Sequence, residues 1–573
     1  MTIDGEYDFI IVGAGPAGSA VAYGLSVAAG KDAKILLIEA GGPNDDRNLR
    51  VDGQRWITFF NEQMNWGYKT APQVHCANRE INYARGKGMG GSSAINFSFF
   101  TVGPKGDYDE WARLVGDQAF SWKNMQARLK TLETFHLELP AGVDPKYASP
   151  RPGDHGDSGP LDVGYAREWE EDLVPLLGLF EDAGYPLNQD HNSGNPLGMG
   201  LVINSAHAGL RSTAADLLKN VSEKNVTILT DTAVQRVVLD GKKVIGVESS
   251  GKRYLASKEV ILCAGTLDSP RILMHSGIGP GDQLRKFDIP VALDAPYVGS
   301  GLKDHTFTLI AYKRTPESGS KRGNFYTDQV AMDAALEQWK KDGAGDWSKF
   351  ACQAGIGFFK LPDTFTSSAE FLALPDTVKE HLNHETVPHF EVVTHIPQHY
   401  FLPDFAKDDK ESYDYMCFGA MLLNGQGQGN VTLQSSDPNV PLLFDPKFLE
   451  HPFDRRAAIE TLREVLKFTK IPAFAKDTLA TIAAPKSDSD EDILEYCRQT
   501  LTTTWHMTGT AKMGRRGDED AVVDSEFRVI GIEGLRVADM SVVPVMANCH
   551  TQAVAYLTGL TCAERIAKSY GYI

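Results

Sequence analysis

The sequence predicts an α/β fold of two domains, in which the first domain is discontinuous and the second is inserted between its pieces. Near the N-terminus, the apolar run 9–12 leads into a glycine-rich turn, a segment of helical periodicity and a second apolar run, 35–38. Short strand-like runs return much later in the chain. At 573 residues, the chain also exceeds what one hydrophobic core usually supports.

Each later stretch is predicted from its pattern. The runs 226–229, 234–239, 260–264 and 535–537 are expected to return to the sheet that the first two runs begin. The intervening chain mixes strand-like runs (390–394, 415–422) with helical ones (455–469, 490–500), which predicts an α+β domain built on an antiparallel sheet. We therefore expect the first domain to comprise 1–110, 205–310 and 500–573, and the second 111–204 and 311–499.

Composition excludes several classes of protein. The formal net charge of −18 would repel a phosphate backbone, so nucleic acid is not expected as a partner. The apolar runs are too short for a membrane-spanning helix, which predicts a soluble protein. The seven cysteines are scattered, without CxxC spacing, so a reducing compartment is expected rather than a disulfide framework or a zinc site. The acidic first residues do not resemble a secretion signal, and a cytoplasmic location follows.

The glycine-rich turn after the first apolar run fits a nucleotide phosphate. Gly13 permits the tight turn, Gly15 lets the backbone approach a pyrophosphate, and Gly18 lets the helix pack on the strand. The helix N-terminus adds the positive end of its dipole. Such a pattern also occurs by chance in glycine-rich loops, but here a strand precedes it and a helix follows.

An acidic residue completes the predicted nucleotide unit. The 32 residues from Asp8 to Glu39 form a strand, turn, helix and strand that end on a carboxylate, where a ribose hydroxyl would be bound. An acid at this place favours an unphosphorylated ribose over NADP. The pattern does not separate FAD from NAD.

Two further segments carry a family resemblance. The run 86–96, with Phe100, Gly103 and Asp109 at fixed offsets, resembles the first signature of glucose/methanol/choline (GMC) oxidoreductases, although Met89 stands where a branched aliphatic residue is usual. The run 265–279 resembles the second signature. Three weaker family-like segments, 65–68, 298–305 and 536–541, follow the expected order, and the resemblance spans residues 8 to 567.

The resemblance implies an FAD-binding domain with the GMC fold, which is Rossmann-like, and an FAD cofactor. It implies that Ser92 and Asn96 contact FAD, that Val234 offers backbone to the adenine, and that Asp539 meets the ribityl or pyrophosphate region; Asn96 could instead only cap its loop. The loop 92–96 holds no histidine that could tether the flavin, so a non-covalent flavin is expected. The full set of predicted cofactor-binding residues is Gly13, Gly15, Pro16, Ala17, Gly18, Glu39, Ala40, Trp66, Arg85, Gly90, Gly91, Ser92, Asn96, Val234, Asp539 and Thr551.

Two histidines form the predicted catalytic pair. The segments 505–514 and 548–553 resemble the family's active-site segments and carry His506 and His550. Alcohol oxidation requires removal of the hydroxyl proton as hydride leaves carbon, which suits a neutral imidazole. His506 is predicted to be the base and His550 to hydrogen-bond the same oxygen, because some relatives carry asparagine at the second position. The helix expected after His550 would point its N-terminus, near Thr551, at the flavin N1/C2 edge.

A second group of histidines suggests a metal site at first sight. It comprises His381, His384, His389, His395 and His399, but Pro397 lies within the HxxxH spacing of the last two and breaks any shared helix face. We expect these histidines to be structural, and no bound metal.

The expected function is oxidation of a small-molecule alcohol, with oxygen or a quinone or dye as electron acceptor. Phe97, Phe99, Phe100 and Trp505 would put aromatic surface beside the flavin and favour an aryl or other apolar primary alcohol. Two alternatives stay open: a hydroxynitrile lyase-like enzyme that keeps FAD without redox turnover, and a non-catalytic flavin-binding protein. The oligomeric state is left open.

Overall fold

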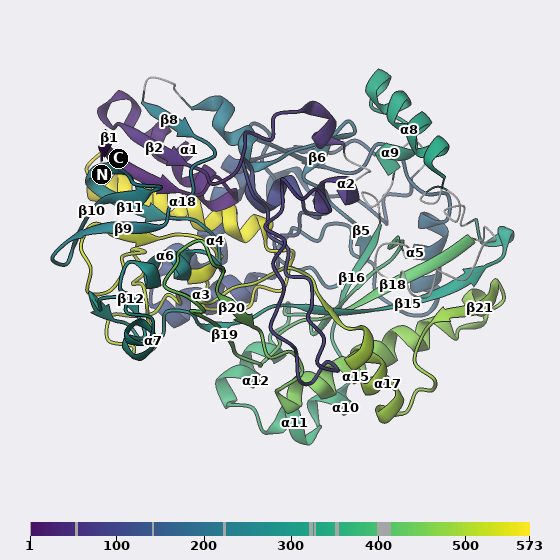
Figure 1. Cartoon of the computed structure of the whole chain (residues 1–573). Helices are drawn as coiled ribbons and strands as arrows, with labels where there is room; N and C mark the ends of the chain where they lie inside the picture. Colours follow the sequence, from purple (N-terminus) through teal and green to yellow (C-terminus); the bar gives the residue numbers. More distant parts are fainter. Residues whose placement is uncertain are drawn as a thin grey trace.

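Two seven-stranded sheets organise the molecule. The computed structural model describes residues 2–51, 55–139, 143–221, 225–319, 325, 328–349, 354–397 and 414–573. Figure 1 shows the first sheet on the left, with both chain termini beside it, and the second sheet on the right. The predicted α/β fold with a second sheet-based domain is confirmed.

The first sheet is mostly parallel and collects strands from distant parts of the chain. Its order is β8 (Val226–Leu229), β2 (Ile35–Ile38), β1 (Thr2–Val12), β11 (Lys252–Leu262), β10 (Lys243–Ser249) and β9 (Arg236–Asp240), and β23 (Leu535–Val537) also pairs with β11. All four later runs predicted to return to this sheet do so, as β8, β9, the end of β11, and β23. The central runs are apolar throughout because helices and strands bury them on both faces.

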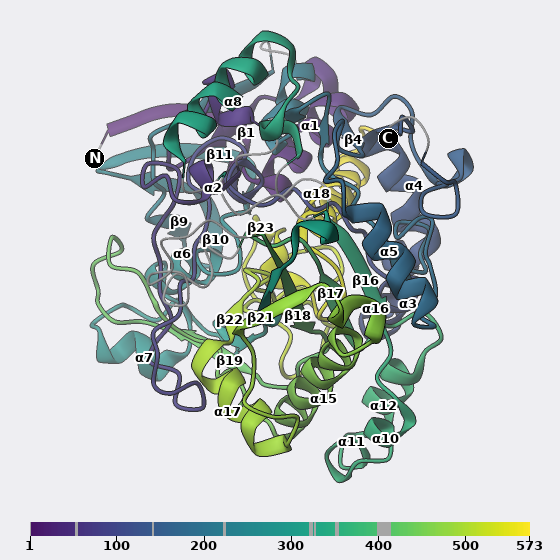
Figure 2. The same ribbon diagram turned by 90° about the vertical axis from the view of Figure 1, so that its right-hand side faces the viewer.

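Two helices from opposite ends of the chain cover this sheet together. In Figures 1 and 2, α1 (Pro16–Ala29) and α18 (Gln552–Ser569) lie against each other. Glycines allow this close approach: a Cβ on Gly559 would lie 2.2 Å from the carbonyl oxygen of Ala17, and one on Gly24 would lie 2.8 Å from Cβ of Ala563. The start of α18, which follows His550, is thereby fixed next to the glycine turn that starts α1.

The second sheet is antiparallel, as predicted for the inserted domain. Its order is β21 (Thr478–Ala483), β15 (Thr306–Arg314), β18 (Asp414–Leu422), β17 (Phe390–Val393), β16 (Gly355–Phe359) and β5 (Gly198–Leu201), and β22 (Thr502–Thr503) also pairs with β15. All of β15 belongs to the second sheet, whereas the predicted domain boundary at residue 310 divides this strand. On one face lie α15 (Pro452–Thr469) and α17 (Asp490–Thr500), as Figure 2 shows.

Alternation along the strands gives the second sheet two different faces. Ile310 and Phe418 belong to the core that includes α15, whereas Phe307 and Met421 belong to a separate cluster on the other side. This other face is turned toward the first domain, and it forms part of the cavity described below.

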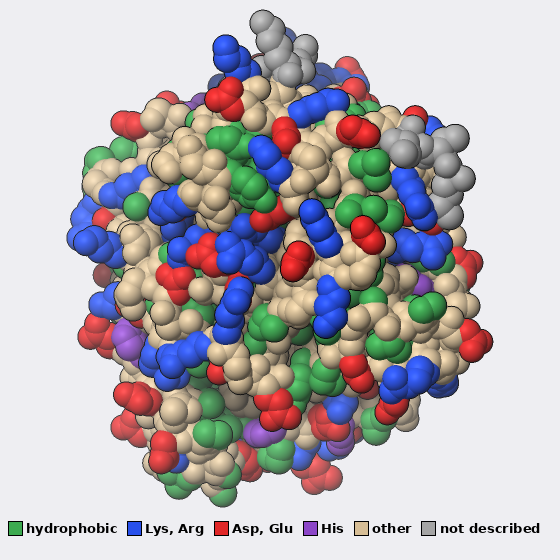
Figure 3. All heavy atoms as spheres, turned by 90° about the vertical axis from the view of Figure 1, so that its left-hand side faces the viewer, with side chains coloured by type: hydrophobic (Ala, Val, Ile, Leu, Met, Phe, Trp, Pro, Cys, Tyr) green, Lys and Arg blue, Asp and Glu red, His purple; other side chains and the backbone are tan. Residues whose placement is uncertain are grey.

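The surface mixes charges of both signs. On the face drawn in Figure 3, basic and acidic side chains are interspersed. Ion pairs among the described residues include Lys252 with Asp4 and Arg236 with Glu248. Within the described residues, no helix is long and apolar enough to cross a membrane.

Candidate active site

One cavity lies between the two sheets of the described chain. Its walls come from the glycine turn after β1, the end of β2, the loops 84–86 and 91–99, the turn after β11, the segment 504–506, the start of α18, and the second sheet. Most of the predicted site residues therefore meet in one place, although they come from segments hundreds of residues apart.

At one end of the cavity, the glycine turn has the geometry that a phosphate requires. Gly13 has a φ of +102°, and a Cβ there would lie 2.4 Å from the carbonyl oxygen of Cys263. A Cβ on Gly18 would lie 1.9 Å from the carbonyl oxygen of Gly13, so Gly18 allows α1 to pack on the turn. Gly15 faces Gly91, and a Cβ on Gly91 would lie 2.6 Å from Cα of Gly15. Bare backbone thus lines this part of the wall.

Glu39 connects three loops at the same end. Its Oε2 accepts a hydrogen bond from the backbone N–H of Ala14 (2.8 Å), and its Oε1 accepts from those of Gly41 and Gly88 (both 2.9 Å). Burial raises the pKa of this carboxyl. Because Glu39 also lines the cavity, it both fixes the loops and can reach a ribose hydroxyl.

Ser92 and Asn96 lie on the cavity wall with their side chains already bonded within the protein. Ser92 Oγ accepts from the N–H of Gly86 (3.1 Å). Asn96 Oδ1 accepts from the N–H of Ser98 (3.0 Å), and its Nδ2 donates to Oε1 of Gln552 (2.6 Å). Asn96 therefore does cap its loop, the alternative raised from the sequence, and it also faces the cavity.

Asp539 also lies on the cavity wall. Its Oδ2 accepts from the N–H of Gly265 (2.8 Å) and from Oγ of Ser269 (2.5 Å), and its Oδ1 accepts from the N–H of Ser541 (2.8 Å). Burial raises the pKa of Asp539. The carboxyl thereby joins the turn after β11 to the segment after β23.

The structure brings together fourteen of the sixteen predicted cofactor residues. The residues on the cavity wall are Gly13, Gly15, Pro16, Ala17, Glu39, Ala40, Trp66, Arg85, Gly91, Ser92, Asn96, Val234, Asp539 and Thr551. Gly18 and Gly90 are not on it. Gly18 allows the packing described above. Gly90 has a φ of +90° where it begins the short helix Gly91–Ala94. Both glycines therefore position residues of the wall without facing the cavity themselves.

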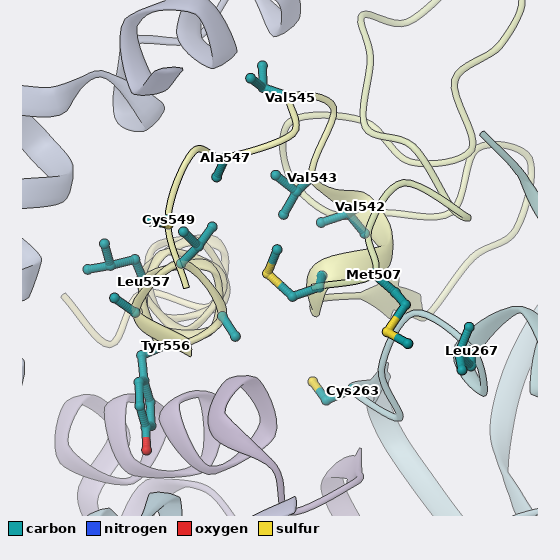
Figure 4. Close-up of a cluster of buried hydrophobic side chains, with 14 of the residues drawn as sticks. Cys263, Leu267, Met507, Val542, Val543, Val545, Ala547, Cys549, Tyr556 and Leu557 are labelled. Atoms are coloured by element: carbon teal, nitrogen blue, oxygen red, sulfur yellow. The ribbon is translucent and has the colours of Figure 1, made fainter. Parts of the chain in front are cut away.

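The two predicted catalytic histidines lie next to each other on the cavity wall. The ring centroids of His506 and His550 are 4.9 Å apart, and the rings are inclined by 72°. Their neighbours in sequence, Met507 and Cys549, belong to the buried apolar cluster drawn in Figure 4. Anchoring both neighbours in a packed core fixes where the two rings lie.

His506 has one ring nitrogen engaged. Its Nδ1 lies 3.0 Å from Oγ1 of Thr504 and 3.1 Å from Nδ1 of His305. The Thr504 hydroxyl donates to the carbonyl oxygen of His305 (3.1 Å), so it can accept the Nδ1–H of His506. This arrangement leaves Nε2 with its lone pair, and Nε2 has no partner among the described residues. Burial, together with the nearby charges of His550 and Arg85, lowers the pKa of His506 well below 6.5.

His550 pairs with an acid that the sequence did not reveal. Its Nε2 lies 2.8 Å from Oε1 of Glu391, whose side chain is fully buried on β17. The backbone N–H of His550 donates to Oγ1 of Thr101 (2.8 Å). Glu391 and Val393 are two positions apart on β17, so their side chains lie on the same face of the second sheet, the face that lines the cavity. The second sheet thus supplies the partner of His550.

Comparison with known proteins decides the family. Models of the GMC oxidoreductase family match residues 7–307 and 425–559. The chain belongs to the GMC oxidoreductase family. It is 30% identical to an oxygen-dependent choline dehydrogenase of Chromohalobacter salexigens, over 99% of this chain and 96% of that protein. It is 31% identical to pyranose dehydrogenase 3 of Leucoagaricus meleagris, over 99% and 94%.

Solved structures agree with this membership. A formate oxidase variant from Aspergillus oryzae, studied for its FAD modification, superposes over 100% of both chains with a TM-score of 0.88 and 26% identity. A fungal aryl-alcohol oxidase superposes over 99% of both chains with a TM-score of 0.84 and 25% identity. This GMC oxidoreductase is thus an FAD-dependent enzyme that acts on CH–OH donors.

The residues of this GMC oxidoreductase fit FAD. Gly15 and Gly91 present a wall without side chains, which a flat pyrophosphate linkage needs. Glu39 and the histidine pair line the same cavity. One elongated dinucleotide could therefore reach from a ribose at Glu39 to the catalytic pair. The N-terminus of α18 opens onto the cavity at Thr551, where its dipole favours negative charge.

Two more residues of the GMC oxidoreductase were missed because they carry no signal of their own. His305 is fully surrounded, and burial lowers its pKa to about 3, so it is a neutral partner for His506. Its neighbour Asp304 accepts the backbone N–H of His506 at 2.8 Å. Both lie in the family-like segment 298–305, whose sequence gave no reason to link them to a residue about 200 positions away.

The described histidines of the second group have hydrogen-bond or ion-pair partners within the protein. His389 accepts from the N–H of Leu361 through Nδ1, and its Nε2 lies 3.0 Å from the carbonyl oxygen of Leu382. His395 lies 3.1 Å from Asp172, but it also lines the cavity, which the sequence did not suggest. His399 lies outside the described residues. Within the described part of the chain, no group of histidine, cysteine and acidic side chains could hold a metal ion.

Proposed function

We propose that this GMC oxidoreductase oxidises an aryl or other apolar primary alcohol, with His506 removing the hydroxyl proton while hydride leaves the carbinol carbon. When bound, FAD accepts that hydride at N5. The observation that carries the proposal is the histidine pair, 4.9 Å apart, on a cavity continuous with the nucleotide turn. Such a pair can hold one hydroxyl oxygen from two sides.

His506 suits the role of proton acceptor. The lowered pKa keeps the imidazole neutral at neutral pH, and its hydrogen bond to Thr504 supports the tautomer with a free lone pair on Nε2. General bases of this kind contribute roughly 10²- to 10⁴-fold to rate.

His550 would then donate a hydrogen bond to the oxygen as its negative charge grows. Glu391 supports this role because its carboxylate compensates a positive charge on the His550 ring and fixes the ring's orientation through Nε2. The Thr101 contact fixes the backbone of His550. The two histidines thus have unequal partners: a hydroxyl and a neutral imidazole for His506, and a buried carboxylate for His550.

The second sheet supports an apolar substrate. The cavity residues that this sheet and its adjoining loops contribute are Phe307, Ala354, Val393, Thr394, His395, Ile396, Pro397, Gly419 and Met421. None of these described residues is Lys, Arg, Asp or Glu, so a charged substrate would lose its hydration without a compensating partner.

Aromatic rings continue this apolar wall. Phe97 lies 4.3 Å from Trp56 and 5.2 Å from Phe59 between ring centroids, and Phe59 lies 4.8 Å from Trp505. Phe99 lies 5.0 Å from the ring of His550. A planar substrate could add its ring to this cluster through edge or offset contacts.

The proposal includes the finer predictions made from the sequence. Oxygen or a quinone or dye serves as electron acceptor, and the domains divide at the limits given above, with β15 assigned to the second domain. The six described cysteines are buried and free, which supports a reducing, cytoplasmic compartment.

Anaerobic mixing with candidate alcohols tests the proposal. Benzylic alcohols should bleach the visible absorbance of the bound flavin faster than glucose at equal concentration. A flavin that no alcohol bleaches would favour the lyase-like or the non-catalytic alternative, and a cyanohydrin cleavage assay then separates those two.

A further inference from the structure

The turn that carries His506 has a strained backbone. Trp505, directly before His506, has a φ of +60°, in the left-handed region that bulky residues rarely adopt. Such strain persists only where the surrounding structure imposes it, and it gathers at functional sites. Both Trp505 and His506 line the cavity, so the strained turn is what presents the base.

Asp304 bonds to both ends of this turn. Its Oδ1 accepts the backbone N–H of His506 (2.8 Å), and its Oδ2 accepts the hydroxyl of Thr503. Thr503 Oγ1 in turn accepts the N–H of Trp505 (2.7 Å). One carboxylate therefore constrains the residues before and after the strained position. Its own segment is fixed against the same turn by the bond from the N–H of Thr504 to the carbonyl oxygen of His305 (3.0 Å).

Arg85 completes the arrangement from the cofactor side. It donates from Nη2 to the carbonyl oxygen of Trp505 (2.7 Å), and its charge attracts Asp304. Arg85 lines the cavity, whereas Asp304 is not among the described residues on its wall. Asp304 therefore acts through the residues that it contacts, the turn and Arg85, and does not itself face the cavity.

We propose that Asp304 is the positioning residue of the catalytic base: its carboxylate holds Trp505 in the left-handed conformation and thereby aims His506 into the cavity. This inference rests on the proposed function only where it concerns the rate of flavin reduction. The conformational part concerns the chain alone and has a test of its own.

The charge state of Asp304 adds a dependence on pH. Burial raises the pKa of Asp304 to about 7, against the opposing effects of the bonds from Thr503 and His506 and of the nearby Arg85. Tyr83 also faces the carboxyl, and the neighbouring His305 is neutral. As the pH falls below about 7, the carboxyl gains a proton, loses its attraction to Arg85, and holds the turn less firmly.

Hydrogen exchange followed by mass spectrometry tests the conformational part on the holoenzyme. Asp304→Ala should raise exchange by about tenfold or more in peptides covering 503–508, and lowering the pH of the wild type through 7 should raise it in the same direction after correction for intrinsic rates. Asp524→Ala is the matched control, because Asp524 is a buried carboxylate that accepts two backbone N–H groups, of Glu526 and Arg528, and pairs with Arg516. Unchanged exchange at 503–508 in Asp304→Ala would overturn the proposal.

Anaerobic stopped-flow kinetics tests the catalytic part. Asp304→Ala should keep its flavin but slow reduction on the order of 10²-fold at saturating alcohol, the cost of an active-site group displaced by about 1 Å, with little change in the apparent Kd of the alcohol. Asp304→Asn can still accept the N–H of His506 but carries no charge, so its rate should lie between those of the wild type and Asp304→Ala, match the wild type at low pH, and lose the pH dependence near 7. An equal loss of rate in the Asp304→Ala and Asp524→Ala variants would contradict a specific role.

The two claims fail separately. If no alcohol bleaches the wild-type flavin, the proposed function is wrong, and the exchange data alone decide whether Asp304 holds the turn. If wild-type reduction is fast but Asp304→Ala matches it, the proposed function stands and the positioning role is wrong.

Discussion

Nε2 of His550 lies 2.8 Å from Oε1 of Glu391, a carboxylate that is fully buried on the central strand β17 of the second sheet. The contact joins the loop before α18 to a strand of the other domain. The second carboxylate oxygen of Glu391 has no partner among the described residues. A buried carboxylate with one bonded oxygen depends on its histidine partner, so the pair acts as a unit.

Replacing Glu391 should weaken His550 as a hydrogen-bond donor to the substrate oxygen. We expect Glu391→Gln to retain FAD and to slow flavin reduction by about tenfold, because glutamine can still accept from Nε2 but supplies no charge. Stopped-flow reduction under nitrogen measures the effect. Glu460→Gln, which changes a buried glutamate paired with Arg456 and Arg463 on α15, should leave the rate unchanged. A wild-type rate in Glu391→Gln would show that the pair is not used in catalysis.

Gly15→Val should abolish FAD binding. A Cβ at Gly15 would already lie 3.8 Å from Cα of Gly91, and the two further methyl groups of valine would occupy the approach of the pyrophosphate. The ratio of visible to ultraviolet absorbance of the purified protein reports flavin content. Gly153→Val, at a position with open space around the new side chain, is the control. Normal flavin content in Gly15→Val would mean that the pyrophosphate does not bind at this turn.

Denaturation should release free FAD into solution. The loop 92–96 holds no histidine to form a covalent link, and its Ser92 and Asn96 side chains are hydrogen-bonded within the protein. After acid precipitation, flavin fluorescence should appear in the supernatant. Flavin that stays with the pellet would disprove the non-covalent assignment.

The buried cluster around His155 should make stability depend on pH. Its Nδ1 lies 3.0 Å from Glu133 and its Nε2 lies 3.1 Å from Asp190. Burial opposes protonation of His155, but the hydrogen bonds to Asp190 and Glu133 outweigh it and raise the pKa to about 9. Because this folded-state pKa exceeds the unfolded value of about 6.5, the stabilisation is present below pH 6.5 and is lost as the pH rises to 9.

Linkage limits this contribution to no more than about 3 kcal/mol, and the burial of Glu133, which raises its own pKa, offsets part of it. Urea unfolding at pH 6.5 and pH 9 should show a difference that His155→Gln reduces. Equal pH dependence in the variant and the wild type would show that the His155 cluster does not cause the pH dependence of stability.

The features predicted correctly from the sequence are those formed by residues close together in the chain. The unit from Asp8 to Glu39 was readable because its strands, turn and helix follow one another, and α18 was readable from its periodicity. By contrast, Glu391 reaches His550 across 159 positions and Asp304 reaches His506 across 202. No local sequence pattern predicts a contact between residues so far apart in the chain. A single acid within the apolar run 390–394 was the one available sign for Glu391, since a charge in a buried strand requires a partner.

The sequence identified the residues of each motif better than it identified which of them face the cavity. Gly18 and Gly90 belong to the expected motifs, yet neither is on the cavity wall, because one allows helix packing and the other begins a short helix. The sequence could not distinguish a glycine that faces a ligand from one that faces the protein. It also could not show that His395 lines the cavity, because a turn of the chain outside any motif places it there.

The rate of flavin reduction in His506→Ala tests the central claim most directly. The variant should bind FAD normally and be reduced by its alcohol roughly 10²- to 10⁴-fold more slowly than the wild type, the usual contribution of a general base. Since the pKa of His506 lies well below 6.5, the wild-type rate should hold at high pH and fall as the imidazole gains its proton in acid, and the variant should lack this fall. His550→Asn should be milder because asparagine can still donate to the oxygen. If His506→Ala is reduced at the wild-type rate, or if His550→Asn is the more damaging change, His506 is not the base.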